Sequence, residues 1–415
     1  MVGRKKCVEE NYLDFLSLLT LFERAELRLH QLFKEIADRE VTLPPCYLEI
    51  ATSYVILENT EGSPEMALRK LARQVESPKL KRFLESYTIV IETTGETSSF
   101  VENELRSEVA SVKGAVDRFN RILEALYEGE AFLILSWMII LLVLSLDISL
   151  YALMSIVLGA GLGVYLYALK TVTRVASPPS WITMLDIALL ATSLVTTLSR
   201  FLVIVHGATA VIVALALRKT RLSHSRFYAL SKIITNQVYS DVSNGIPLEL
   251  SLKNNLESSD PSLRVLWFAT ENGYDPVLST KSLGIIGLPA KIISMLLSGL
   301  NHAWDQLSFI TAFNSIATYY WEVREHLVEK AKMFYIYVAV IATLILFSSW
   351  IMSSYGFGTS PPGFAGLVYT SVLSLILPVL LMSEEGYAWS IKNTLAIFML
   401  GTILYIGPVF FEGSA

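Results

Sequence analysis

The longest apolar stretch of this chain runs from residue 131 to 217 and holds 87 residues, of which only five are formally charged. A helix that crosses a bilayer needs only about 20 apolar residues, so this stretch is long enough for roughly four of them. We therefore expect four transmembrane helices in two hairpins. The five charged residues of the stretch are Asp147, Lys170, Arg174, Asp186 and Arg200.

Three further apolar runs, at about 333–352, 364–382 and 394–411, raise the expected number of transmembrane helices to about seven. Basic residues follow the second and fourth expected helices, and the positive-inside rule then places the N-terminus and both polar flanks in the cytoplasm. Seven spans would leave the C-terminus outside. No cleavable signal peptide is expected, because acidic residues follow the basic ones near the start. The sequence predicts a multi-pass protein of the cell membrane.

The two polar flanks differ in charge but share a helical pattern. Residues 1–130 carry 17 Lys+Arg and 23 Asp+Glu, net −6, while residues 218–332 carry 12 and 10, net +2. Neither contains a convincing strand, and short connections favour antiparallel packing. We expect an all-α integral membrane protein with two cytoplasmic helical bundles, at 1–130 and 218–332. Transmembrane segments would occupy 131–217 and 333–415.

The first flank contains a long periodic segment followed by clear turn signals. Apolar residues recur at three- and four-residue spacings from 12 to 36, which predicts one amphipathic helix with Asp14 and Glu23 on its polar side. Glycine closes helices, while serine followed by proline is typical of a helix start. Such signals stand at Gly62 with Ser63 and Pro64, at Ser77 with Pro78, and at Gly95.

The same signals recur in the second flank at an offset of 183 residues. Residues 61–71 read EGSPEMALRKL and residues 244–254 read NGIPLELSLKN. Each copy is followed by a helix that leads into an apolar segment, which favours a duplicated unit over coincidence. The paired positions are Gly62 with Gly245, Pro64 with Pro247, and Pro78 with Pro261.

These turns resemble those of the type II secretion F-domain family, the platform proteins of type II secretion, type IV pilus and archaellum machines. The two hairpins expected between the copies are similar to the archaeal branch of that family. The positions that carry the resemblance are Gly62, Pro64, Ala67, Leu68 and Gly95 in the first copy, and Gly245, Pro247, Leu252 and Gly299 in the second.

The resemblance implies an inner-membrane platform that couples a cytoplasmic hexameric ATPase to the insertion of pilin-like subunits into a filament. It also implies membrane lipid around the spans and favours a homodimer, the commonest arrangement of soluble oligomers. It leaves open whether the filament is a pilus, an archaellum or a secretion pseudopilus.

Motifs of catalysis are not found. The sequence has no GxxxxGK[ST] phosphate loop, no HExxH cluster and no GxSxG elbow, so we expect no enzyme, no cofactor and no metal. The net charge of −5 argues against nucleic-acid binding. The two cysteines, Cys7 and Cys46, are expected to be free thiols in a reducing compartment.

Two groups of charged residues are candidate sites. A basic run in the first flank could dock the acidic surface of the ATPase, or could be a solvated helix face balanced by Glu65, Glu76 and Glu85. The run consists of Arg69, Lys70, Arg73, Lys79, Lys81 and Arg82.

Ionisable residues in the apolar stretch are the second group, because charge within a membrane is costly and often functional. Asp186, Arg200 and His206 could line the path of a multi-pass membrane transporter, which is the alternative function, or could be interfacial anchors. Gly159 and Gly163 form a small-xxx-small pair that predicts close helix packing, either within one chain or between two subunits.

Overall fold

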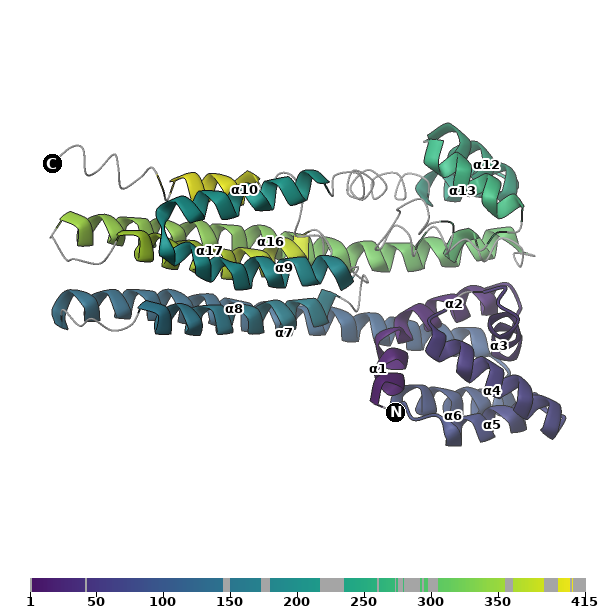
Figure 1. Cartoon of the computed structure of the whole chain (residues 1–415). Coiled ribbons are helices and arrows are strands. Elements are labelled where there is room, and N and C mark those ends of the chain that lie inside the picture. Colours follow the sequence, from purple (N-terminus) through teal and green to yellow (C-terminus); the bar gives the residue numbers. More distant parts are fainter. Residues whose placement is uncertain are drawn as a thin grey trace. The chain divides into compact units, whose positions relative to one another are not determined.

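The structure is a computed structural model in which every described element is a helix (Figure 1). It describes residues 2–41, 43–144, 150–172, 180–216, 235–259, 261–272, 305–354, 361–383 and 395–403, with a few isolated residues between 274 and 297 and at 405. The all-α class is therefore correct. Gly299 and the expected turn near Asp147 lie outside the described residues.

The chain divides into two compact units, each made of two segments that are far apart in the sequence. Unit 1 combines Met1–Lys113 with Ser223–Glu322, and unit 2 combines Gly114–Leu222 with Val323–Ala415. Most of each polar flank thus belongs to unit 1, whereas unit 2 contains the apolar stretches and the flank residues 114–130, 218–222 and 323–332.

The helices of unit 1 are mostly short. They are α1 (Val2–Glu10), α2 (Tyr12–Arg24), α3 (Leu29–Ala37), α4 (Pro45–Glu61), α5 (Pro64–Gln74), α6 (Pro78–Thr93), α12 (Leu248–Ser259) and α13 (Pro261–Glu271). The helices of unit 2 are α8 (Leu150–Val172), α9 (Ser180–Thr192), the 3-10 helix η1 (Ser193–Leu198), α10 (Arg200–Ala216) and α17 (Pro361–Ser383). The two long helices, α7 (Thr97–Leu144) and α16 (Gln306–Ser354), contribute residues to both units.

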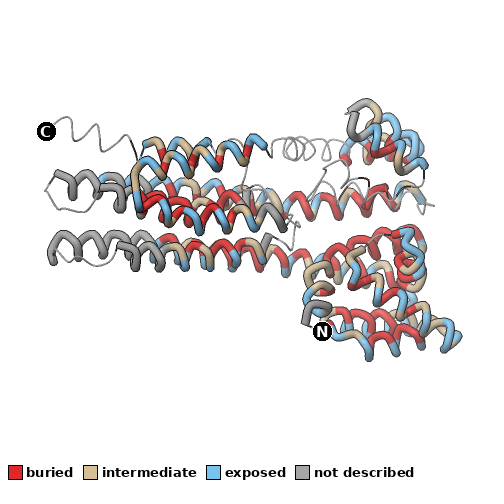
Figure 2. The backbone as a smooth tube through the Cα atoms, viewed as in Figure 1, coloured by how far each residue is buried: buried red, intermediate tan, exposed pale blue. Residues whose placement is uncertain are grey.

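Helix α2 is the central element of unit 1. Every residue from Tyr12 to Glu23 is buried, as Figure 2 shows along α2. The chain leaves the helix at Ala25 and Glu26, where φ is +63°, and starts α3 at Leu29. The single amphipathic helix expected at 12–36 is therefore wrong, because a left-handed residue breaks it and its first half has no polar face.

The core around α2 is aromatic. The ring of Phe15 stacks on Tyr47 of α4 with 5.0 Å between centroids, and meets Phe83 of α6 edge-on at 5.8 Å. Phe33 of α3 lies at 6.1 Å. Because Phe15 is fully buried, it joins the three helices that surround α2.

The turns of unit 1 follow from local residue chemistry. Gly62 ends α4 with φ of +68°, a conformation that glycine adopts without steric cost. The Ser63 hydroxyl then accepts a hydrogen bond from the Met66 amide, and Pro64 occupies the first turn of α5. Ser77 caps α6 in the same way, and Gly95 ends the connection to α7 with φ of +72°.

The second copy has the same turn with a shifted helix register. Gly245 has φ of +86°, and α12 begins just after Pro247. The buried residues Ser251 and Leu252 of α12 correspond to the buried residues Ala67 and Leu68 of α5. These pairs are 184 residues apart in the sequence, one more than the offset of 183 that relates the turns. The offset of 183 returns in α13, where the buried pair Leu266 and Trp267 corresponds to Phe83 and Leu84.

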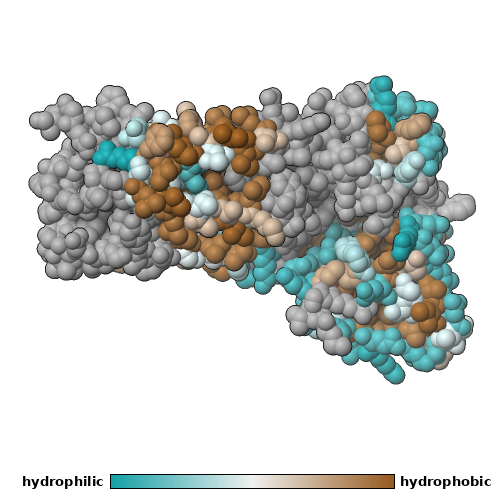
Figure 3. All heavy atoms as spheres, in the orientation of Figure 1, coloured by the Kyte–Doolittle hydropathy of each residue, from teal (hydrophilic) through white to brown (hydrophobic). Residues whose placement is uncertain are grey.

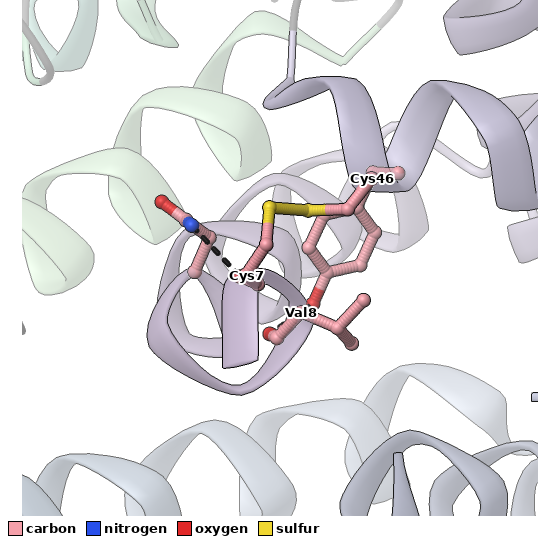
Figure 4. The surroundings of a disulfide bond; sticks show 5 residues. Cys7, Val8 and Cys46 are labelled. Carbon is pink, nitrogen blue, oxygen red and sulfur yellow. Dashed lines mark hydrogen bonds between the residues drawn. A yellow bond between two sulfur atoms is a disulfide. The ribbon is translucent and has the colours of Figure 1, made fainter. Parts of the chain in front are cut away.

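A disulfide joins Cys7 of α1 to Cys46 at the start of α4 (Figure 4), with 6.2 Å between the Cα atoms. The expectation of two free thiols is therefore wrong. Cysteine spacing alone did not indicate the bond, because 39 residues separate the partners and only the packing of α1 against α4 brings them together.

In the part of the chain that the structure describes, no helix is both long and apolar enough to cross a membrane. The prediction of about seven transmembrane helices is wrong, and with it the multi-pass membrane location, its orientation and the membrane form of the pilus-assembly platform. Helix length gives part of the reason: α9 has 13 residues and α10 has 17. At 1.5 Å per residue these span roughly 20 and 26 Å, less than the ~30 Å hydrocarbon core.

Unit 2 is held together by close packing at glycine. Helices α8 and α17 lie against each other, and a Cβ placed on Gly161 would lie 2.2 Å from the Ser374 Cβ. A Cβ placed on Gly366 would lie 2.7 Å from the Thr197 backbone of η1. By contrast, Gly159 and Gly163 are exposed, and a Cβ on either would meet nothing within 4 Å. In α8, the glycine that packs closely within the chain is therefore Gly161. A contact between two subunits through Gly159 and Gly163 stays a prediction.

Candidate docking surface

The basic run predicted from the sequence lies on the hairpin of α5 and α6. In α5, the buried residues are Ala67, Leu68, Leu71 and Ala72, and the cations Arg69, Lys70 and Arg73 lie at other positions. In α6, the buried set is Leu80, Phe83, Leu84, Tyr87 and Thr88. Figure 3 shows hydrophilic side chains over the edge of unit 1 that these two helices form. The 3.6-residue period of each helix thus separates the cations from the core.

Three of the six cations are neutralised by carboxylates. Arg69 binds Glu92 at the far end of α6, and Lys70 binds Glu61 at the end of α4. Lys79 lies 2.7 Å from Glu108 of α7, and its ammonium stands 5.6 Å from the centre of the Tyr12 ring. Such partly exposed pairs contribute about 0 to 1 kcal/mol each, but they remove these cations from the set available to a partner.

The acidic residues expected to balance the run are not the partners observed. Glu65 instead accepts a hydrogen bond from the Ser63 hydroxyl at 2.6 Å, which holds the pKa of its carboxyl below the usual value. The observed partners Glu61, Glu92 and Glu108 lie 9, 23 and 29 residues from their cations. Sequence spacing along one helix could identify none of these pairs.

The other three cations are Arg73, Lys81 and Arg82, and we call them the basic surface. All three are exposed, and within the described residues none forms an ion pair with a carboxylate. Arg82 donates from Nε to the Pro78 carbonyl at 3.4 Å. Arg73 lies in the last turn of α5, and Lys81 and Arg82 are the fourth and fifth residues of α6, so the basic surface flanks the turn that joins the two helices.

A buried polar network fixes this hairpin to the rest of unit 1. The Glu23 carboxylate of α2 accepts hydrogen bonds from the Tyr87 hydroxyl of α6 and from the Thr97 hydroxyl of α7, the latter at 2.6 Å. The Tyr87 oxygen in turn accepts from the Leu29 amide at 3.1 Å. A satisfied buried network of this kind sets one arrangement of the helices and makes the hairpin a rigid platform.

A second network ties α2 to α16. The Tyr320 hydroxyl, which is fully buried, donates to the Asp14 carboxylate at 2.7 Å. The Ser17 hydroxyl lies 3.5 Å from the Tyr320 hydroxyl oxygen. Asp14 and Glu23, both expected on a polar helix face, are therefore structural anchors of the core. Sequence reasoning missed them because their tyrosine partners lie 306 and 64 residues away.

Glu23 makes the stability of unit 1 depend on pH. Burial is the main cause that raises the pKa of its carboxyl, and the hydrogen bonds from Thr97 and Tyr87 only partly oppose it. A carboxyl with a raised pKa in the folded state stabilises the fold fully below its unfolded pKa, and this contribution is lost as pH rises through the folded value.

We therefore expect Glu23→Gln, which keeps an acceptor for Tyr87 and Thr97, to weaken the fall in unfolding free energy as pH rises above the ordinary range of a glutamate carboxyl. Urea denaturation at a series of pH values measures this effect. Equal pH dependence in the wild type and the variant would contradict the assignment.

Two of the polar residues of the apolar stretch have hydroxyl partners on neighbouring helices. The Asp186 carboxylate accepts from the Tyr165 hydroxyl of α8 at 2.6 Å. The His206 ring has Nε2 at 2.9 Å from the Thr192 hydroxyl and Nδ1 at 3.0 Å from the Tyr369 hydroxyl. Arg200 is the first residue of α10. The hydroxyl partners of Asp186 and His206 belong to α8, α9 and α17, and no sequence signal pointed to them.

Unit 2 presents a different kind of surface. On α10 a narrow stripe of small residues faces inward, and a Cβ placed on Gly207 would lie 3.2 Å from the Phe398 backbone. Large apolar side chains of α10 are exposed, and Figure 3 shows such side chains gathered over the described part of unit 2. The exposed residues are Phe201, Val205, Ile212 and Leu215, and we call them the apolar surface.

The described residues contain no group of three or more His, Cys, Asp or Glu that could hold a metal ion. Comparison with protein-family models, with curated proteins and with solved structures finds no match. The site is therefore defined by its geometry alone, as an exposed basic surface on a rigid helical hairpin.

Proposed function

We propose that this protein is a non-catalytic helical scaffold of a filament-assembly machine, which docks a hexameric ATPase on unit 1 and pilin-like subunits on unit 2. The single observation that carries the proposal is the basic surface on the α5–α6 hairpin. It supports docking of an acidic partner because its cations are exposed without carboxylate partners on a hairpin that a buried network holds rigid.

The duplicated turn supports the same proposal. Both copies place a left-handed glycine and a helix-starting proline at corresponding positions, which are the features that resemble the type II secretion F-domain family. Each copy also precedes a long helix, α7 with 48 residues and α16 with 49. These continuous helices are the elements through which motion of a docked ATPase would pass to the rest of the chain.

The apolar surface supports the second partner. Phe201 and Ile212 expose 61% and 64% of their surface, which is unusual for side chains of this size and is typical of an interaction site when several gather together. Pilin-like subunits with an apolar helical face would bury these side chains, at about 25 cal/mol per Å² of area removed from water.

Docking is tested by charge reversal on the basic surface. Lys81→Glu together with Arg82→Glu should reduce co-purification of the cognate ATPase at least about tenfold, because two attractive contacts become repulsive. Binding of the wild-type protein should weaken as salt is raised, because exposed attractive charges are screened, and binding of the double variant should depend less on salt. Pull-down of purified full-length chain with the ATPase at two salt concentrations measures both effects.

The second hairpin offers a matched control. Lys253 and Arg264 are exposed cations of α12 and α13, and both correspond to cations of the first hairpin at the offset of 183. Reversing both to Glu changes the net charge by the same amount but should leave ATPase binding unchanged. Equal loss of ATPase binding in the two double variants would show a general charge effect and would overturn docking at the basic surface.

The apolar surface is tested by the double variant Phe201→Ser, Ile212→Ser. If this variant still retained pilin-like subunits, the proposed role of the apolar surface would be overturned.

A further inference from the structure

The disulfide between Cys7 and Cys46 attaches helix α1 covalently to α4, and α1 also packs against α2 and α6. Of the residues of α1 whose side chains are described, only Val8 is buried. A single hydrogen bond to α1 from another helix is present among the described residues, from the Tyr47 hydroxyl to the Val8 carbonyl at 3.0 Å (Figure 4). The remaining polar contacts, between Lys6 and Glu10 and between Asn11 and the Cys7 carbonyl, are local. A helix of nine residues is not stable by itself in water.

Helix α1 also forms one wall of a pocket. The pocket has a volume of about 130 Å³ and lies between α1, α4 and the turn that joins α5 to α6. Lys5 and Val8 contribute the α1 wall, while Ile50 of α4 and Leu71 of α5 contribute apolar side chains that are 4% and 1% exposed. Moving α1 away would therefore uncover an apolar floor beside the turn that carries the basic surface.

The two sulfur atoms are not equally accessible. Cys46 is 6% exposed, whereas Cys7 is half-buried. A reducing thiolate can therefore reach the Cys7 sulfur more readily than the Cys46 sulfur, and attack there expels the Cys46 thiolate, which takes up a proton. With a dithiol reductant, its second thiol closes a ring and expels Cys7 as the other thiol. Two electrons pass to the protein and the reductant becomes a cyclic disulfide.

We propose that the Cys7–Cys46 disulfide is a reversible redox latch: reduction by a dithiol releases α1 from α4 and opens the pocket between α4 and the α5–α6 turn, while the aromatic core around α2 stays folded. The core stays folded because the contacts of Phe15 with Tyr47, Phe33 and Phe83, and those of Glu23 with Tyr87 and Thr97, do not involve α1. The latch does not depend on the function proposed above.

Hydrogen exchange of the full-length chain tests the latch, with and without dithiothreitol and with thiol alkylation and mass measurement to verify the oxidation state. On reduction, amides of α1 should exchange at least about tenfold faster, because a helix of nine residues that has lost its cross-link is not stable by itself. Amides of Phe15 to Leu19 in α2 should keep their protection. The double variant Cys7→Ser, Cys46→Ser should show fast exchange of α1 with and without reductant.

Three results would overturn the latch. Slow exchange of α1 in fully reduced protein would show that other contacts hold it. Loss of protection in α2 on reduction would show that the disulfide supports the whole unit. A disulfide that dithiothreitol does not reduce in the folded protein would be a permanent bond and not a latch. All three can be measured on reduced wild-type protein, so the test does not depend on whether the double variant folds.

Discussion

Phe15→Ala is expected to lower the unfolding free energy of unit 1 by about 3 to 5 kcal/mol. Phe15 is fully buried in α2, and its ring meets Phe33, Tyr47 and Phe83 at centroid distances of 6.1, 5.0 and 5.8 Å. Removing the ring leaves a cavity among three helices that other buried contacts hold in place, so the site can collapse only partly. Urea denaturation, followed by far-ultraviolet circular dichroism, measures the loss of unfolding free energy.

Ile89→Ala is the matched control for this prediction. Ile89 lies on α6 and is 57% exposed, so its truncation should change the unfolding free energy by less than about 0.5 kcal/mol. A Phe15→Ala variant as stable as this control would show that α2 is not the central helix of the unit.

Gly161→Ala is expected to destabilise unit 2 by about 1 to 3 kcal/mol. The added methyl group would lie 2.2 Å from the Ser374 Cβ and 3.1 Å from the Ser374 Cα, so α8 and α17 would have to separate. Thermal unfolding of the full-length chain, followed by circular dichroism, measures the effect on the transition of unit 2.

The glycine two residues further along α8 provides the control. Gly163→Ala meets nothing within 4 Å and replaces glycine inside a helix, so it should be neutral or stabilise by up to about 1 kcal/mol. Because both variants add one methyl group to the same helix, their difference isolates the contact with α17. Similar stability of the two variants would mean that α8 and α17 do not pack closely at Gly161.

Local signals in the sequence located many helix ends correctly. Ser63 and Ser77 accept hydrogen bonds from amides in the first turns of α5 and α6, and Gly62 and Gly95 are left-handed. These features depend on a few adjacent residues, whose side-chain and backbone chemistry acts over one turn. They could therefore be identified without knowing what packs against each helix.

Periodicity was less informative about burial. The polar positions Asp14 and Glu23 suggested a solvent-facing side of α2, but both are buried because Tyr320 and Tyr87 supply hydroxyl partners. A hydropathy pattern treats a carboxylate as exposed, and only the presence of a distant hydrogen-bond partner changes that. The same limit applies to the basic run, of which half is neutralised by carboxylates from other parts of unit 1.

The sequence by itself determined the all-α class, the duplicated turn and the separation of polar flanks from apolar stretches, because each of these follows from short-range residue patterns. Only the tertiary structure decided that α2 is buried, that Cys7 and Cys46 are bonded and that Gly161 makes the close contact in α8. It also overturned the expected membrane spans, because no helix among the described residues is both long and apolar enough to cross a membrane. Residues far apart in the chain make these contacts, so no local pattern could specify them.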